Sequence, residues 1–274
     1  MHLHLYGYGS MGRLHAKKLE KHADVSVDII DPPKGYAPST KRCDAAIVAT
    51  PGQTHCAIAE PLLRQGIPVL LEKPIASSAK DAQRLSQYPT LCVGHIERFS
   101  PVWERCKSAR PRFVQTERLA PFSGRGTDSS VLLDIMIHDL ELCLHFFPGE
   151  LLDVRGIGIS VCSSTYDIVN ARLEFPSGVA QLSASRVSRV PHRTMRLFGT
   201  EDYWSCDFKN RTLHRMEWSK GDLAGASVPL SSVDPLEQEQ AAFLRFVRDG
   251  TPFPCSATTA ARAVSLAEAI EATL

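Results

Sequence analysis

Short apolar runs that end in turn residues alternate with helix-spaced apolar positions through the first third of the chain. The runs predict five strands, at residues 3–6, 25–30, 45–50, 66–71 and 90–95. Between them, apolar residues spaced three to five apart predict helices. Strands that are apolar throughout and alternate with helices are typical of a parallel sheet covered on both faces. We therefore expect an α/β fold whose first part is a doubly wound, Rossmann-type parallel sheet.

The pattern changes near residue 96, where longer alternating strands with hairpin turns replace the strand and helix units. These strands are predicted at residues 113–119, 154–161, 168–175, 179–186, 194–198, 203–208 and 212–218. One apolar helix, Ser130 to Phe147, interrupts them, and two helices close the chain. We expect domains at 1–96 and 97–274, the second an α+β domain built on a large, mostly antiparallel sheet. The C-terminal helix could pack back on the first domain.

A glycine-rich segment joins the first strand to the first helix. It reads G-x-G-x-x-G, with Gly7, Gly9 and Gly12 around Ser10 and Met11. Gly7 permits a tight turn, and Gly12 lets helix and strand pack closely. Gly9 lets the backbone approach a pyrophosphate, and the helix N-terminus offers this anion free N–H groups. The segment predicts a dinucleotide site; the alternative is a glycine-rich turn that binds nothing.

Polar residues follow several of the predicted strands. Asp31 ends the second strand, Thr50 and His55 follow the third, and Lys73 follows the fourth. Because ligands of such sheets bind beyond the carboxyl ends of the strands, these residues converge with Gly9 on one crevice. A carboxylate at Asp31 would bind a ribose 2′-hydroxyl and favour NAD over NADP, although strand-end acids are also common in plain turns. About a dozen residues separate Asp31 from the third strand, too few for a full crossover helix.

The helix that interrupts the second domain carries ionisable residues on an apolar background. Asp134 and His138 are four residues apart and share a face, with Glu141 further along it. A carboxylate beside an imidazole raises its pKa and suits a general base, but the pair could equally be structural. No zinc-type spacing connects His95 with His138, so no metal site is predicted.

Lys73 lies between Glu72 and Pro74, directly after a buried strand. Its ammonium could stabilise negative charge on a reacting oxygen, or could form a salt bridge with Glu72.

Composition excludes several classes of function. The 274 residues include 43% hydrophobic and 22% charged residues, with 31 basic against 30 acidic side chains. A net charge of +1 favours neither nucleic acid nor a membrane as partner. No run of about 18 apolar residues and no signal-like segment is present, so we expect a cytoplasmic protein. The eight cysteines form no C-x-x-C pair.

Four motifs in this order resemble the Gfo/Idh/MocA family of nicotinamide-dependent oxidoreductases. They are G-x-G-x-x-G-x-x-H at residues 7–15, Thr50-Pro51 with His55, Glu72-Lys73-Pro74, and Asp134-x-x-x-His138. The resemblance implies that the first three motifs hold NAD. It also implies that Lys73 and His138 flank the reacting carbon with Asp134 assisting, and that the C-terminal sheet forms a homodimer or homotetramer.

Two further segments, residues 93–101 and 185–188, resemble the branch that oxidises nucleotide-linked amino sugars, the UDP-N-acetylglucosamine 3-dehydrogenases. Guanidinium groups suit a diphosphate, and the candidates are Arg98, Arg186, Arg189, Arg193 and Arg196. Sheet alternation prevents all five from facing one pocket, and any one of them could lie on a solvated basic face. Arg98 and Arg186 are the predicted substrate contacts, together with Lys73, Asp134 and His138.

We therefore predict NAD-dependent oxidation of a sugar secondary alcohol to a ketone, at C3 of a UDP-N-acetylhexosamine. The alternatives are a polyol, inositol or free-sugar dehydrogenase, a glycosidase that uses NAD transiently, and a nucleotide-binding protein without catalysis. The chain departs from the family pattern twice. The crossover helix after Asp31 is missing, which affects how adenine is held, and Gly124 to Ser130 lacks the usual glycine pair.

Overall fold

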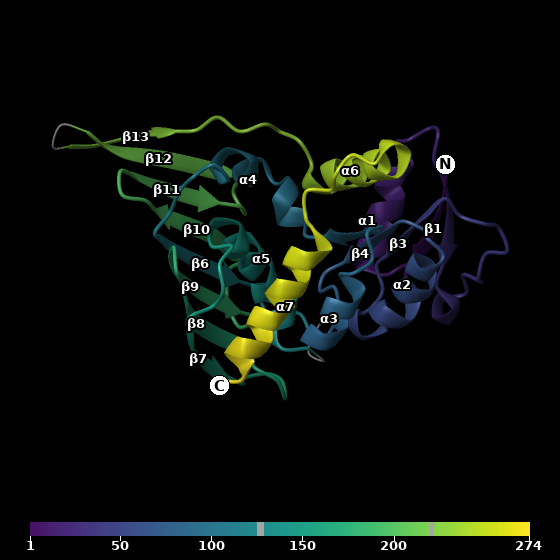
Figure 1. Cartoon of the computed structure of the whole chain (residues 1–274), viewed down its shortest axis with the longest axis horizontal. Coiled ribbons are helices and arrows are strands. Elements are labelled where there is room, and N and C mark those ends of the chain that lie inside the picture. Colours follow the sequence, from purple (N-terminus) through teal and green to yellow (C-terminus); the bar gives the residue numbers. More distant parts are fainter. Residues whose placement is uncertain (125–128, 220–221) are drawn as a thin grey trace. The chain divides into compact units, whose positions relative to one another are not determined.

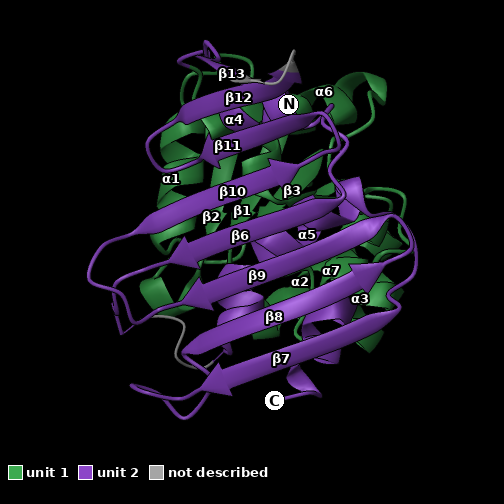
Figure 2. Cartoon of the chain, turned by 90° about the vertical axis from the view of Figure 1, so that its left-hand side faces the viewer, with its two compact units in different colours: residues 1–99, 233–264 green, residues 100–232, 265–274 purple. Residues whose placement is uncertain are grey.

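The computed structural model spans residues 1–274 and describes all of them except 125–128 and 220–221. The chain forms two compact units, which Figure 2 colours separately. The first comprises residues 1–99 and 233–264, and the second residues 100–232 and 265–274. The first unit therefore includes, besides the predicted 1–96, a helical segment from near the C-terminus.

The first unit is built on a five-stranded sheet in the order β2-β1-β3-β4-β5, of which Figure 1 labels β1, β3 and β4. Every neighbouring pair is parallel, which confirms the predicted Rossmann-type sheet. The strands are β1 (His2–Tyr6), β2 (Ser26–Ile30), β3 (Ala45–Val48), β4 (Val69–Glu72) and β5 (Leu91–Gly94). The helices are α1 (Ser10–Leu19), α2 (His55–Arg64), α3 (Ala79–Leu85) and α6 (Pro235–Asp249), with the 3₁₀ turns η1 (Pro32–Lys34), η2 (Gly52–Thr54) and η3 (Ile96–Phe99). A last helix, α7 (Ala257–Glu271), contributes residues to both units.

The core of this unit lies on one face of β1. Leu3 and Leu5 are fully buried and pack in one cluster with Leu19 of α1 and with Phe243 and Leu244 of α6. Because successive side chains of a strand point to opposite faces, the even-numbered residues of β1 project from the other face of the sheet.

The connection from β2 to β3 is short. These strands lie on either side of β1, so residues 31–44 must cross it, and they contain η1 but no α-helix. The sequence predicted this missing crossover helix from the length of the segment.

The second unit is built on an eight-stranded sheet in the order β13-β12-β11-β10-β6-β9-β8-β7, seen face-on in Figure 2. All its neighbouring pairs are antiparallel except β6 with β9, so the predicted mostly antiparallel sheet is confirmed. The strands are β6 (Phe113–Leu119), β7 (Asp153–Ile159), β8 (Ile168–Phe175), β9 (Gly178–Ser185), β10 (His192–Phe198), β11 (Asp202–Asp207), β12 (Thr212–Ser219) and β13 (Asp222–Ser227). The helices α4 (Pro101–Cys106) and α5 (Ile137–Phe146) lie behind the sheet in that view.

The predicted helix from Ser130 to Phe147 is divided in two. A π-helical turn, η4 (Leu132–Met136), precedes α5, and Ser130 accepts the backbone N–H of Asp134 at 3.1 Å. Single π-turns inside helices are frequent at functional sites, because they change the direction of the side chains that follow.

Candidate active site

The glycine turn between β1 and α1 has the geometry that an anion site requires. Gly7 has a φ of +89°, and a Cβ on Gly12 would lie 1.9 Å from the carbonyl oxygen of Gly7. A Cβ on Gly9 would meet only Lys34 Nζ, 4.0 Å away. Gly9 is the N-cap of α1 and carries no side chain to cap it, so the first amides of the helix, at Ser10 and Met11, remain open to a ligand. The open space at Gly9 therefore leaves the N-terminus of α1 accessible, as the predicted pyrophosphate site requires.

Asp31 lies against this turn. Its Oδ2 accepts the backbone N–H of Tyr8 at 2.7 Å and the ammonium of Lys34 at 3.0 Å. The Tyr8 amide and Lys34 lower the pKa of the Asp31 carboxyl, so it is ionised at neutral pH. The sequence analysis missed Lys34, although its place in the turn directly after Asp31 was a usable signal.

His55 connects the ends of β3 and β4. Its Nδ1 lies 2.7 Å from the carbonyl oxygen of Pro74, and its Nε2 lies 2.9 Å from that of Thr50. Burial lowers the pKa of His55, and the two carbonyls offset this only in part. The ring therefore fixes the loop that carries Thr50 and Pro51 against the Lys73–Pro74 segment. Thr50 also lies beside Gly7: a Cβ added to Gly7 would be 2.8 Å from Thr50 Cγ2.

Glu72 points toward α1. Its Oε1 lies 2.8 Å from Nε2 of His15, the histidine of the glycine motif. Gln240 of α6 places its amide nitrogen 3.0 Å from both Nδ1 and the carbonyl oxygen of His15. Because that amide donates, Nδ1 must accept, and the proton of His15 lies on Nε2, which donates to Glu72. The Glu72 carboxylate thus holds α1, and Lys73, half-buried, follows it directly.

Glu239 completes this buried group and was not predicted. It is fully buried, and neither carboxylate oxygen has a hydrogen-bond partner among the described residues. A Cβ on Gly94 would lie 3.5 Å from both Glu239 oxygens and from Cδ of Glu72. Burial, with the nearby charge of Glu72, raises the pKa of Glu239 well above its ordinary value and so favours its protonated form.

Asp134 and His138 lie in the second unit, on the π-turn η4 and in the first turn of α5, and both are half-buried. The next residue, Asp139, is buried and accepts two nitrogens of Arg118 on β6, Nη2 at 2.7 Å and Nε at 3.1 Å. This ion pair, which the sequence did not indicate, fixes the start of α5 on the sheet.

Arg186 is buried at the end of β9. Its Nη2 donates to the carbonyl oxygen of Ser129 at 2.6 Å, and its Nε lies 3.6 Å from Asp167. Backbone amides around Cys162 overcome the effect of burial and keep the pKa of Asp167 below its ordinary value. Arg186 thereby holds the chain just before η4. Arg98, the other predicted substrate contact, lies in η3 of the first unit and is also buried.

The predicted site residues are therefore distributed over both units. Those proposed for the cofactor, with Lys73 and Arg98, belong to the first unit, and Asp134, His138 and Arg186 belong to the second. Of the segment from Gly124 to Ser130, residues 125–128 lie outside the described part of the chain.

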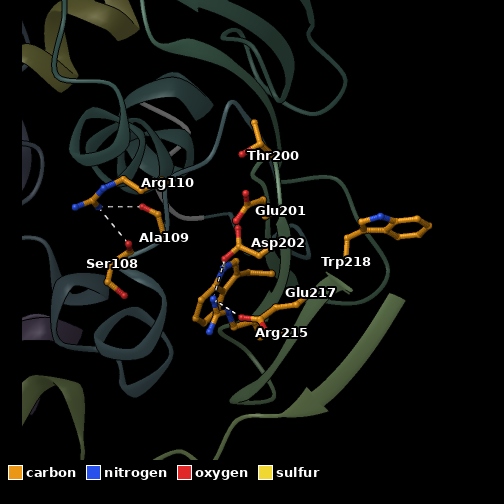
Figure 3. Close-up of a pocket in the computed structure, with 10 residues that line it drawn as sticks. Ser108, Ala109, Arg110, Thr200, Glu201, Asp202, Arg215, Glu217 and Trp218 are labelled. Atoms are coloured by element: carbon orange, nitrogen blue, oxygen red, sulfur yellow. Dashed lines mark hydrogen bonds and ion pairs between the residues drawn. The ribbon is translucent and has the colours of Figure 1, made fainter. Parts of the chain in front are cut away.

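A pocket of about 490 Å³ occurs elsewhere in the second unit (Figure 3). Arg215 contacts the carboxylates of Asp202 and Glu217 there, at 3.3 and 2.6 Å, and lies 4.8 Å from the centre of the Trp204 ring. None of the predicted site residues lines this pocket.

Two family descriptions match the chain. Residues 20–89 match the description "Oxidoreductase family, NAD-binding Rossmann fold", and residues 102–204 match "GFO/IDH/MocA C-terminal domain". The UDP-N-acetylglucosamine 3-dehydrogenase of Acidithiobacillus ferrooxidans is 33% identical over 291 aligned positions, which cover 95% of this chain and 93% of that protein. The chain belongs to the Gfo/Idh/MocA family.

Other comparisons agree with this membership. A solved structure of the Acidithiobacillus dehydrogenase superposes on this Gfo/Idh/MocA oxidoreductase with a TM-score of 0.91 and 30% identity, covering all of this chain and 97% of that one. The scyllo-inositol 2-dehydrogenase (NAD(+)) of Bacillus subtilis is 25% identical over 71% of this chain and 70% of its own length. A myo-inositol dehydrogenase from Corynebacterium glutamicum, 19% identical with a TM-score of 0.80, covers this whole chain and 96% of its own and shares the fold. In the described part of this oxidoreductase, no helix is long and apolar enough to cross a membrane.

Proposed function

We propose that this protein is an NAD-dependent dehydrogenase that oxidises the C3 hydroxyl of a UDP-N-acetylhexosamine to a ketone. The observation that carries the proposal is the similarity to the Acidithiobacillus UDP-N-acetylglucosamine 3-dehydrogenase along almost the entire length of both chains. The inositol dehydrogenases are less similar to this chain.

The glycine turn supports the choice of a dinucleotide cofactor. NAD, when bound, accepts a hydride from the alcohol carbon. The pyrophosphate would lie at Gly9 and the amides of Ser10 and Met11, and Asp31 would face the adenosine ribose. A carboxylate there favours a 2′-hydroxyl over a 2′-phosphate, which supports NAD rather than NADP.

The residues proposed for chemistry are Lys73, Asp134 and His138. Lys73 would hold the alcohol oxygen and stabilise the charge that develops on it, His138 would take the hydroxyl proton, and Asp134 would assist His138. Thr50, Pro51 and His55 would frame the cofactor. Glu72 would hold His15 and thereby help to position Lys73, which follows it in the chain. Arg98 and Arg186 are proposed to bind the nucleotide end of the substrate.

The test is a panel of UDP-sugars and free polyols with NAD, followed by NADH absorbance. We expect turnover of UDP-N-acetylglucosamine and a loss of kcat of at least about 10³-fold in Lys73→Ala and in His138→Asn. NAD binding, measured by calorimetry, should stay within threefold in both variants. Two variants are the matched controls and should keep the wild-type activity. Lys80→Ala changes an exposed lysine shortly after Lys73, and His145→Asn changes a histidine two turns along α5 from His138.

Three outcomes would reject the proposal in distinct ways. Oxidation of inositol but of no UDP-sugar would make the protein a polyol dehydrogenase. If the protein cleaves a glycoside while its NAD stays tightly bound and oxidised at the end of each turnover, it is a glycosidase. NAD binding without turnover of any panel member would indicate a nucleotide-binding protein.

We also propose a cytoplasmic homodimer or homotetramer. The face of the eight-stranded sheet opposite α5 carries exposed apolar side chains, among them Ile157 at 64% and Ile159 at 51% exposure on β7. Exposed apolar patches of this kind mark protein interfaces. Light scattering would measure the oligomeric state in solution, and a monomer would reject this proposal.

A further inference from the structure

Two histidines and an aspartate meet on the first two strands of the sheet. His2 and His4 are two residues apart on β1, so both side chains project from the face opposite Leu3 and Leu5. On the neighbouring strand β2, Asp28 is the register partner of His4. One ring nitrogen from each histidine and one carboxylate oxygen of Asp28 lie within 4.8 Å of one another.

The burial of His4 indicates that this group serves a ligand. The residue is only 6% exposed, and its Nε2 is buried where no described residue offers it a hydrogen bond. An imidazole nitrogen binds a metal ion through its lone pair, so a buried ring nitrogen that no described residue contacts is available as a ligand.

The distances among these three side chains suit a small tetrahedral ion. His2 Nε2 lies 3.3 Å from Asp28 Oδ2. That separation is the one expected between two ligands of zinc, since Zn–N and Zn–O bonds of about 2.0–2.2 Å at tetrahedral angles place the ligand atoms roughly 3.3–3.5 Å apart. One ring nitrogen of His4 lies within 4.8 Å of the other two ligand atoms and would complete three ligands by moving toward them.

Two of these side chains also have a supporting partner. His2 Nδ1 lies 2.9 Å from Ser26 Oγ, and the hydroxyl of Ser39 donates to Asp28 at 2.5 Å. Such second contacts orient metal ligands and are typical of metal sites.

The surroundings provide access for an ion. Ser39 and Lys41 belong to the short β2–β3 connection, which passes over β1 in place of a crossover helix. A cavity of about 300 Å³ adjoins Asp28 and is also lined by Tyr36, Ala37 and Ser39. Asp28 is therefore the ligand that an ion reaches from this cavity, which also leaves room for water as a fourth ligand.

We propose that His2, His4 and Asp28 form a binding site for a divalent transition-metal ion, with Zn²⁺ as the ion it fits. The ligand set of two imidazoles and one carboxylate matches the preference of zinc and its neighbours and excludes Mg²⁺ and Ca²⁺, which prefer oxygen ligands. The site lies on the strands themselves, before the glycine turn at the carboxyl end of β1. Its role is to tie β1 and β2 to the connection that crosses them, and the site does not depend on the proposed reaction.

The test uses the full-length protein after dialysis against a chelator. Calorimetric titration with ZnCl₂ and elemental analysis should give one zinc per chain, and titration with Co²⁺ should give the visible d–d bands of a four-coordinate site. His4→Asn and Asp28→Asn should each weaken zinc binding by at least about 100-fold, and Ser39→Ala by roughly tenfold. Zinc should raise the melting temperature of the wild type but not of the two ligand variants.

His22→Asn is the matched control, because it removes another histidine of the same unit from the turn that leads into β2. It should bind zinc as the wild type does. Circular dichroism confirms that each variant is folded, and Asp28→Asn, at a partly exposed position, serves if His4→Asn does not fold. The proposal is overturned if the wild type binds less than one zinc at 100 µM, or if a folded ligand variant binds zinc within threefold of the wild type.

Discussion

At the scale of single residues, the cofactor site depends on side chains from distant parts of the sequence. The backbone geometry at Gly7, Gly9 and Gly12 could be predicted from the sequence, because it follows from local requirements of the turn, whereas their contact with a cofactor stays a prediction. The contacts of His15 and Glu72 could not, because Gln240 and Glu239 approach them from α6, which lies more than 200 residues after His15 and more than 160 after Glu72. No periodicity in α6 indicates which part of the sheet that helix will cover.

The buried Glu239 gives stability an unusual dependence on pH. Its folded-state pKa is raised, so the native state holds a proton that the unfolded chain releases above pH 4.5. The free energy of unfolding should therefore fall as pH rises from 4.5 toward the folded-state pKa, by about 1.4 kcal/mol per pH unit for this group. Glu239→Gln, which resembles the neutral acid, should remove that contribution, so its stability relative to the wild type should increase as pH rises above 5.

Urea unfolding at several pH values would measure this effect. Glu237→Gln is the control on the same helix: the ion pairs that Glu237 forms with Lys21 and Lys18 lower its pKa, and its carboxylate is ionised in both states above pH 6. Its pH slope should match that of the wild type there. An unchanged slope in Glu239→Gln would mean that Glu239 is ionised in the native protein.

At the scale of elements, strand and helix identities could be predicted wherever the apolar pattern was strong. The five parallel strands and the antiparallel second half follow from continuous and alternating apolar runs respectively. The division of the predicted helix at Met136 could not be predicted, because a π-turn changes the hydrogen bonding without changing the apolar pattern. His2-x-His4 was also overlooked, since its third ligand comes from a neighbouring strand and not from a recognisable spacing.

The position of α5 on its sheet should depend on the Arg118–Asp139 pair. Arg118→Met removes the guanidinium from a buried carboxylate and should cost about 3–5 kcal/mol of unfolding free energy, with a fall in kcat because His138 precedes Asp139. Arg172→Met, which removes an exposed partner of Glu174, should cost no more than about 1 kcal/mol. Chemical denaturation and initial rates would measure both.

Adding Asp139→Asn to Arg118→Met tests the cause. If the buried charge is responsible, the double variant should be more stable than Arg118→Met alone. If Arg118→Met loses no more unfolding free energy than Arg172→Met, the Arg118–Asp139 pair does not hold α5.

At the scale of the whole molecule, the sequence indicated the change of architecture near residue 96 and that the C-terminal helix could pack back on the first domain, but not that α6 completes the core of the first unit. Phe243 and Leu244 complete the core around Leu3 and Leu5. Losing two such side chains costs on the order of 5–10 kcal/mol, comparable with the stability of a whole domain. A fragment of residues 1–99 should therefore show no cooperative thermal unfolding.

Joining residues 233–264 to that fragment through a flexible linker should restore a cooperative transition. Circular dichroism at increasing temperature would compare the two fragments, and a joined fragment with Phe243→Ala and Leu244→Ala is the control. Cooperative unfolding of residues 1–99 alone would show that α6 is dispensable for the first unit.

The late position of α6 also determines when the first unit can fold during synthesis. Translation proceeds at about 5–20 residues per second, so roughly 10–30 s pass between the emergence of residue 99 and that of α6. Through that interval the apolar face of β1 lacks the helix that covers it in the finished protein. The last contacts of the first unit, including that of Gln240 with His15, therefore form only after α6 has been made.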